Sequence, residues 1–209
     1  MRFAILCTAR SGSTWLHTLL NSHPNIHSEG ETVLLHHNLN PGQSFQDFAY
    51  SAYPLVIRSV GLKVFYDDDL YQEALNSIKK DEGVRIIHLI RKDLTGQFIS
   101  FQKAAASGEW SFHKDSLSSK LRIDTNALQE YHKRQKLLRE QIKLDFKNHA
   151  FMEITYEDLV KETGRVTIEI QKFLEIKQKK LFSLLKKQAI KPLKSEVENW
   201  NELVDKGFI

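Results

Sequence analysis

The chain of 209 residues is short of several features that mark specialised classes of protein. It has one cysteine, Cys7, so no intramolecular disulfide framework can form. Its four prolines and nine glycines are scattered, and no linker or low-complexity tract separates two domains. The lack of disulfides is typical of a reducing compartment. We therefore expect a cytoplasmic protein that folds as a single domain over residues 1–209.

Long apolar runs and a strong charge bias are missing as well. No stretch approaches the roughly 20 apolar residues of a transmembrane helix. The apolar run at residues 3–7 is too short for a signal peptide. The net charge is +4, from 30 basic and 26 acidic residues. This small excess suits an anionic ligand and argues against a nucleic-acid-binding surface.

What the chain does contain is a candidate anion site in its first thirty residues. Residues 3–7 have the composition of a buried strand, and apolar residues at helical spacing predict a helix that begins near Thr14. Between them lies a loop of small polar residues with one cation, Arg10, and one glycine, Gly12. Glycine permits backbone conformations closed to other residues, and the first amides of a helix have no intrahelical partner. Arg10, these amides, the loop hydroxyls and the helix dipole would all attract a phosphate or sulfate.

The same residues also fit an ordinary turn between a strand and a helix, because Ser, Thr and Gly are common in turns and helix caps. The loop is not a Walker A sequence, since GxxxxGK[ST] is absent and Arg10 precedes the glycine. No aspartate at a strand end stands out as a Mg²⁺ ligand. We therefore expect no metal site, and a metal-assisted nucleotide hydrolase is disfavoured.

Short apolar strands alternate with helical patterns along the chain. Strands are predicted at residues 3–7, 60–65, 84–90 and 150–155, and residues 28–51 are predicted to be mostly loop and short helix. Helices are predicted at residues 70–78, 97–105, 127–146 and 157–174, and the Lys-rich C-terminal third is helical in tendency. This alternation predicts a three-layer α/β fold, with a central parallel sheet of about four to five strands flanked by helices.

Two of the predicted strands are followed by basic residues. Arg10 follows the first strand, and Arg91 and Lys92 follow the strand at residues 84–90. In a parallel sheet, ligands bind outside the carboxyl ends of the strands. If these two strands are neighbours, their cations form two anion sites close together, which suits a ligand with two separated phosphate groups. The alternative for Arg91 and Lys92 is a solvated strand end.

These residues resemble the sulfotransferases that use 3′-phosphoadenosine 5′-phosphosulfate (PAPS) as the sulfuryl donor. The first motif of that family is a strand followed by [KR]-[ST]-G-[ST]-T-x-[LV], and residues 10–16 (RSGSTWL) match it at every place. The second motif is a strand, a basic residue and a serine eight places later. Here Lys92 lies eight places before Ser100 and Arg91 lies nine places before it, so both stay candidates.

Further segments extend the resemblance over nearly the whole chain. Residues 61–63 (GLK), 154–159 (ITYEDL) and 195–203 (SEVENWNEL) are similar to the second strand, the end of the fourth strand and the C-terminal segment of the family. The pair Gly30 and Glu31 and the segment at residues 104–110 (AAASGEW) resemble the bacterial carbohydrate group, which includes trehalose and nodulation-factor enzymes. The R-K-G-x-x-G element of the cytosolic steroid and phenol enzymes is missing, which argues against close kinship with them.

The resemblance implies a P-loop-like, nucleoside-kinase-like fold and a role for each matched residue. The 5′-phosphosulfate would be bound by the residues of the first motif, namely Arg10, Ser11, Gly12, Ser13, Thr14 and Trp15. The 3′-phosphate would be bound by Arg91 or Lys92 and by Ser100. Trp15 would flank the donor or else be a core residue. Lys63 would help to bind the donor or only end its strand.

The acceptor hydroxyl must lose a proton, so a general base is needed within hydrogen-bond reach. The candidates that follow the first helix are His23, His27, Glu29 and Glu31. The carbohydrate group has a glutamate in a G-E pair soon after this helix, which selects Glu31, with Glu29 as its nearest competitor. Arg10 would act with this base by stabilising charge on the leaving oxygen.

We therefore predict a metal-independent enzyme that transfers a sulfuryl group from PAPS to a hydroxyl of a carbohydrate-containing acceptor and releases adenosine 3′,5′-bisphosphate. Its partner would be a small-molecule or glycan acceptor, with no nucleic acid and no transmembrane segment, and a homodimer is left open. The acceptor pocket is predicted in residues 28–51 and 107–121. Two alternatives stay open: a P-loop-like nucleotide or small-molecule kinase, and a non-catalytic anion-binding module on the same fold.

Overall fold

A computed structural model describes residues 1–31, 53–108, 110, 120–185 and 192–209 of the chain. These residues form two compact units. The first unit consists of Met1–Lys92 and Gln141–Leu184, and the second consists of Asp93–Glu140 and Leu185–Ile209. The expected single domain stays a prediction.

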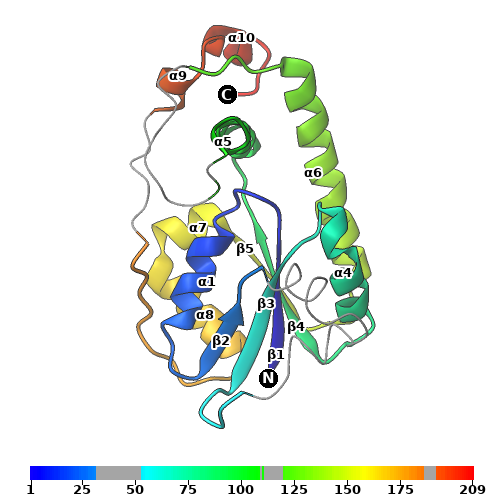
Figure 1. Ribbon diagram of the computed structural model, residues 1–209, viewed down its shortest axis with the longest axis vertical. Coiled ribbons are helices and arrows are strands. Elements are labelled where there is room, and N and C mark those ends of the chain that lie inside the picture. The colour runs from blue at the N-terminus through cyan, green and yellow to red at the C-terminus, as the bar shows by residue number, and fades with distance from the viewer. Residues whose placement is uncertain (32–52, 109, 111–119, 186–191) are drawn as a thin grey trace. The chain divides into compact units, whose positions relative to one another are not determined.

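A parallel sheet is the centre of the first unit (Figure 1). Its five strands are β1 (Arg2–Cys7), β2 (Ile26–Glu29), β3 (Ser59–Phe65), β4 (Val84–Ile90) and β5 (Phe151–Thr155). They lie in the order β2-β3-β1-β4-β5. Because every pair is parallel, all five carboxyl ends lie at one edge of the sheet. The predicted neighbour relation is confirmed, since β1 pairs directly with β4 and places Cys7 opposite Leu89.

Helices cover both faces of this sheet, as the three-layer prediction requires (Figure 1). On one side lie α1 (Ser13–Asn21), α7 (Tyr156–Lys161) and α8 (Thr163–Phe173). On the other side lies α4 (Gln72–Lys79), which follows the short 3-10 turn η1 (Asp69–Tyr71). A sheet that is covered on both faces buries every side chain of its central strand. This is why residues 3–7 of β1 are all apolar, and all of them are fully buried.

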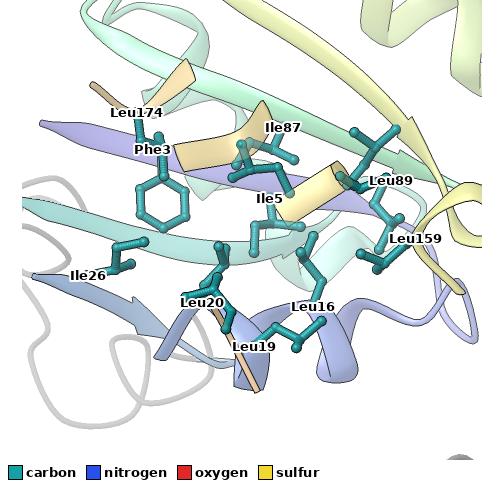
Figure 2. Packing of buried hydrophobic residues seen from close by; sticks show 14 of the residues in the cluster. Phe3, Ile5, Leu16, Leu19, Leu20, Ile26, Ile87, Leu89, Leu159 and Leu174 are labelled. Carbon is teal, nitrogen blue, oxygen red and sulfur yellow. The ribbon is translucent and has the colours of Figure 1, made fainter. Parts of the chain in front are cut away.

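The core on the α1 side shows how the strand and helix periodicities meet (Figure 2). Alternate residues of β1, Phe3 and Ile5, face this core, and Leu16 and Leu20 of α1 lie against them. Leu159 of α7 belongs to the same cluster. Each such side chain contributes on the order of 1.5–3 kcal/mol through burial, so this packing fixes α1 on the sheet and fixes the loop before it.

The second unit is helical in its described residues. It contains α5 (Leu94–Ser107), most of α6 (Thr125–Asp145), α9 (Leu193–Glu196) and α10 (Trp200–Asp205). Asp93 caps α5, because its side chain accepts a hydrogen bond of 2.7 Å from the Gly96 amide. The core of this unit consists of six buried apolar residues: Phe98, Ile99, Ile123, Leu128, Val197 and Leu203.

Two predicted elements differ from the structure. Strand β2 was not predicted. It is a short, polar edge strand (IHSE) in which only Ile26 and Ser28 are buried, so its sequence carries little strand signal. The helix expected at residues 157–174 is two helices, because Glu162 has a non-helical backbone (φ −132°, ψ 45°). Thr163 and Gly164 follow the break and are weak helix formers.

Candidate functional site

The loop between β1 and α1 has the backbone of an anion-binding turn. Arg10 and Gly12 both have a positive φ, of 61° and 88°. Gly12 is the N-cap residue of α1, and among the described residues no side chain caps the first turn of this helix. That turn also contains no acidic residue. Its amides and the positive end of the helix dipole are thus available to an anion.

Gly12 is required for a second reason, the close approach of Tyr156. A Cβ atom added at Gly12 would lie 2.4 Å from Cδ2 of Tyr156, a distance at which one of the two must move. Tyr156 is the first residue after β5 and the first of α7. Its ring therefore packs directly against the loop. The resemblance quoted Tyr156 within ITYEDL, but only the structure shows that it supports the loop.

Two guanidinium groups meet at this loop. Arg91 Nη1 donates a hydrogen bond of 3.4 Å to the Arg10 carbonyl oxygen, and the Arg91 guanidinium lies over the Tyr156 ring, 5.0 Å from its centroid. Partial burial of Arg10 lowers its pKa, and the nearby positive charge of Arg91 lowers it further. We call Arg10, Gly12, Arg91 and Tyr156 the donor edge. Like charges brought together in a partly buried place favour a bound anion.

Lys92 has different contacts from its neighbour Arg91. Its side chain is 63% exposed, and its Nζ lies 3.8 Å from Asp158 Oδ2. Its amide donates a hydrogen bond of 3.0 Å to Glu157 Oε2. Between the two candidates, Arg91 is therefore the one that lies against Arg10. Ser100 is a half-buried residue within α5 of the second unit, so its partnership with either cation stays a prediction.

The remaining residues of the first motif divide between the core and the surface. Ser11 and Ser13 are buried, Thr14 is exposed, and Trp15 packs against the core cluster of α1. The position of Trp15 fits the core alternative. Cys7, the last residue of β1, is fully buried, and this burial raises the pKa of its thiol to about 12 against the opposing influence of Lys63. A thiol this protected is not a candidate nucleophile.

The candidate bases lie near the carboxyl end of β2. Glu29 Oε1 is 2.6 Å from His27 Nε2 and accepts a hydrogen bond of 3.0 Å from the Tyr53 hydroxyl. Glu31 Oε1 instead accepts a hydrogen bond of 2.9 Å from Lys63 Nζ. We call His27, Glu29, Glu31 and Lys63 the carboxylate cluster. Each of its two glutamates thus has a cationic or titratable partner of its own.

The two further histidines near this cluster have structural surroundings. His23 is 1% exposed, and its ring contacts the Lys177 carbonyl oxygen at 2.9 Å and the Asn25 amide at 3.0 Å. These contacts make His23 a buried structural residue rather than a base. His17 was not singled out from the sequence. Its Nδ1 lies 3.0 Å from Ser28 Oγ, and burial lowers its pKa, with the charge of Lys63 as the next cause.

The structure does not test two of the predictions, the acceptor pocket and the absence of a metal site. Most of the expected acceptor pocket, at residues 28–51 and 107–121, lies outside the described residues. The expected absence of a metal site stays a prediction. In the part of the chain that the structure describes, no group of three or more His, Cys, Asp and Glu side chains could hold a metal ion. No described helix is both long and apolar enough to cross a membrane.

A parallel α/β sheet with a helix N-terminus, Arg10 and Arg91 at its carboxyl edge has the architecture of a P-loop-like fold. Comparison with known sequences identifies the family. Residues 3–60 and 82–180 match the Sulfotransferase family. The chain belongs to this family, and its reaction class is the transfer of a sulfuryl group.

Individual relatives are distant. Nodulation protein H of Rhizobium meliloti (strain 1021) is 24% identical over 221 residues, which cover 96% of this chain and 89% of that protein. Nodulation protein H of Rhizobium tropici is 25% identical over 189 residues, which cover 82% of this chain and 74% of that protein.

Solved structures are similar at lower identity. The mouse sulfotransferase SULT7A1 complexed with PAP has a TM-score of 0.48 and 16% identity, and 85% of this chain spans 60% of that one. The sulfotransferase domain of the Synechococcus PCC 7002 olefin synthase has a TM-score of 0.49 and 14% identity, over 86% of this chain and 74% of that one.

Proposed function

We propose that this enzyme transfers the sulfuryl group of PAPS to a hydroxyl of a carbohydrate-containing acceptor, and that the donor edge binds the donor without a metal. The observation that carries this proposal is the pair Arg10 and Arg91 beside the uncapped N-terminus of α1. The fit of a phosphate there is supported by the Gly12 cradle, in which a side chain would collide with Tyr156. PAPS supplies an activated sulfuryl group joined to its 5′-phosphate.

The donor edge has the charges that such a transfer needs. A new bond forms between the acceptor oxygen and sulfur, the bond from sulfur to the 5′-phosphate oxygen breaks, and that oxygen keeps the electron pair. Arg10 and the first amides of α1 would stabilise this growing negative charge. Arg91 would bind a second anionic group, which we assign to the 3′-phosphate together with Ser100.

Glu31 is the proposed general base. It would take the proton of the acceptor hydroxyl on a carboxylate oxygen as the new bond to sulfur forms. Glu31 follows β2 and is half-exposed, so its carboxylate is accessible to a ligand from solvent. The Glu29 side chain is 30% exposed, against 49% for Glu31, and it contacts both His27 and Tyr53. This difference supports Glu31 over its neighbour.

The carbohydrate acceptor is proposed from the G-E pair and the AAASGEW segment, which resemble the bacterial carbohydrate group. The named relatives are both nodulation proteins of rhizobia, and the reaction class comes from the family match instead. A single, fully buried cysteine supports a cytoplasmic enzyme. The small net charge of +4 supports a small-molecule or glycan partner over a nucleic acid.

Two measurements test the proposal. Calorimetry in excess chelator should show binding of adenosine 3′,5′-bisphosphate, and a separate titration with Mg-ATP, without chelator, should show weaker binding. The second measurement incubates the enzyme with ³⁵S-labelled PAPS and a panel of sugars, lipids and phenols, and we expect the label in a sugar. Binding of the bisphosphate only when Mg²⁺ is present would contradict the metal-free site. Preferential binding of Mg-ATP would favour a kinase, and binding without label transfer would favour a non-catalytic module.

A further inference from the structure

Lys63 is an unusual residue for the interior of a parallel sheet. It lies in β3, which pairs with β2 on one side and β1 on the other. In the register of the sheet Lys63 is opposite Ile5, whose side chain belongs to the core on the α1 face. Paired residues of neighbouring strands share a face, so the Lys63 side chain lies on this face too. It is 4% exposed.

A buried ammonium is stable only with a partner of opposite charge or with several hydrogen bonds. Glu31 provides the charge, with its Oε1 at 2.9 Å from Lys63 Nζ, and the Phe65 ring lies 5.0 Å from the same nitrogen. The Glu31 side chain is 49% exposed. The pair therefore joins a cation fixed inside the sheet to a carboxylate that reaches the surface.

The surroundings confirm that this cation acts on its neighbours. The charge of Lys63 helps to lower the pKa of His17 on α1, after burial, and opposes the rise in the pKa of Cys7 on β1. The Glu31 charge contributes, after burial, to the raised pKa of Tyr71 in η1. The titratable groups on which the charges of the pair act thus come from β1, α1 and η1: Cys7, His17 and Tyr71.

We infer that Lys63 is the positioning residue of the reaction: it holds the Glu31 carboxylate in one place for proton transfer. This inference rests on the proposed role of Glu31 as the base. Lys63 acts through Glu31 and not on the reacting atoms. A strand lysine with one carboxylate partner differs from a surface ion pair, because its backbone is fixed on both sides by the sheet. Glu31, at the end of a strand and next to Gly30, has no such fixation of its own.

A merely structural ion pair and a positioning pair predict different kinetics. Without Lys63, the hydrogen bond of 2.9 Å no longer holds the Glu31 carboxylate in place, so we expect kcat to fall by about 10- to 100-fold while the KM for PAPS stays within about two-fold. In a Glu31→Gln background the same substitution should lower kcat no further, because the group that Lys63 positions is already inactive. A structural defect would lower kcat in both backgrounds, and a direct contact of Lys63 with the donor would raise KM.

The experiment compares Lys63→Met, Lys63→Arg, Glu31→Gln and the double variant Lys63→Met with Glu31→Gln against the wild type. Lys79→Met is the matched control, because Lys79 also forms an ion pair at 2.6 Å, with Asp145, but lies on α4. The assay measures kcat and KM for release of adenosine 3′,5′-bisphosphate from PAPS at one fixed pH. Its acceptor is the sugar that takes up most label in the panel, or water if none does. Lys63→Gln replaces Lys63→Met if the latter does not fold, as judged by bisphosphate binding.

We expect kcat to fall in Lys63→Met and to stay near its wild-type value in Lys63→Arg and Lys79→Met, with KM unchanged in all three. The double variant should have the same kcat as Glu31→Gln alone. An unchanged kcat in Lys63→Met, or an equal fall in both backgrounds, with Glu31→Gln inactive, would overturn the positioning role and leave Glu31 as the base. A Glu31→Gln variant with near-normal kcat would instead overturn the proposed base itself.

Discussion

The donor edge and the carboxylate cluster treat charge in opposite ways. At the donor edge, Arg10 and Arg91 carry the same charge, and the charge of Arg91 lowers the pKa of Arg10, after burial. In the carboxylate cluster, each glutamate is matched with a partner, Glu29 with His27 and Glu31 with Lys63. An anion bound beside two like charges offsets their repulsion, whereas paired charges already offset each other. We therefore expect a ligand at the first region, and side chains held in place by one another at the second.

The largest expected effect tests the carboxylate cluster. Glu31→Gln keeps the size of the side chain and its hydrogen-bonding capacity, but the amide cannot accept the acceptor's proton. We expect kcat to fall by about 10²–10⁴, the usual contribution of a general base. Bisphosphate affinity, measured by calorimetry, should stay within a few-fold of the wild type because the donor edge is untouched.

The matched controls for this change are Glu29→Gln and His27→Asn, which alter the other pair of the cluster. Both should keep most of the activity. If one of them abolishes turnover while Glu31→Gln remains active, the base is that neighbour.

A somewhat smaller effect is expected from the donor edge. Arg10→Ala removes a charge that matters most as the leaving phosphate oxygen becomes negative. We expect kcat to fall by about 10²–10³, with a smaller change in donor affinity. Steady-state kinetics separate the two possibilities, since a raised KM with an unchanged kcat would show that Arg10 only anchors the donor.

The next smaller effect distinguishes two adjacent cations, Arg91 and Lys92. Arg91→Ala should weaken bisphosphate binding by about 10- to 100-fold, the range for a lost hydrogen bond to a charged group. Lys92→Ala should change it less than about five-fold, because Lys92 is largely exposed and lies beside Asp158. Adenosine 5′-phosphate, which lacks the 3′-phosphate, should bind Arg91→Ala and wild type about equally. A larger loss in Lys92→Ala than in Arg91→Ala would reverse the assignment.

The smallest expected effect concerns Cys7, the fully buried last residue of β1. Its pKa of about 12 means that about one thiol in ten thousand is ionised at pH 8. A thiol reagent such as DTNB should therefore react with the native protein no faster than the protein unfolds. A stoichiometric burst of reaction in the native state would contradict this burial.

The pH dependence of stability follows with a definite sign. The folded state favours the neutral thiol, so this contribution is fully present below the ordinary pKa of 9.0. It is lost as the pH rises from there toward about 12. Urea unfolding at pH 8 and pH 10 measures the loss, and Cys7→Ala should reduce it.

Much of the fold could be predicted because its strong elements carry their own signal. The observed β4 coincides with the predicted strand at residues 84–90, and β1 and β3 differ from their predictions by one residue each. Strand β2 escaped prediction because an edge strand of four residues with a polar sequence has little to distinguish it from a loop. The break at Glu162 escaped because a helix can end without proline when its backbone leaves the helical region.

The candidate site, too, could be predicted only in part. The anion loop could be predicted from residues 10–16, since a glycine and small hydroxyl residues before a helix have a local physical meaning. The contact between Tyr156 and Gly12 could not be predicted, because the two residues are 144 positions apart in the sequence. Lys63 carried an ambiguous signal, a cation inside an apolar strand, whose meaning depends on the carboxylate that faces it.

The sequence by itself determined the class of this protein. Apolar runs and their spacing depend on neighbours along the chain, and they specify strands, helices and the loop that carries Arg10 and Gly12. The tertiary structure decided which charges meet. Arg91 rather than Lys92 lies against Arg10, and Lys63 rather than a histidine holds Glu31, because the register of the parallel strands and the packing of α1 and α7 fix where each side chain ends. Charge interactions fall off with distance in space and take no account of distance in sequence.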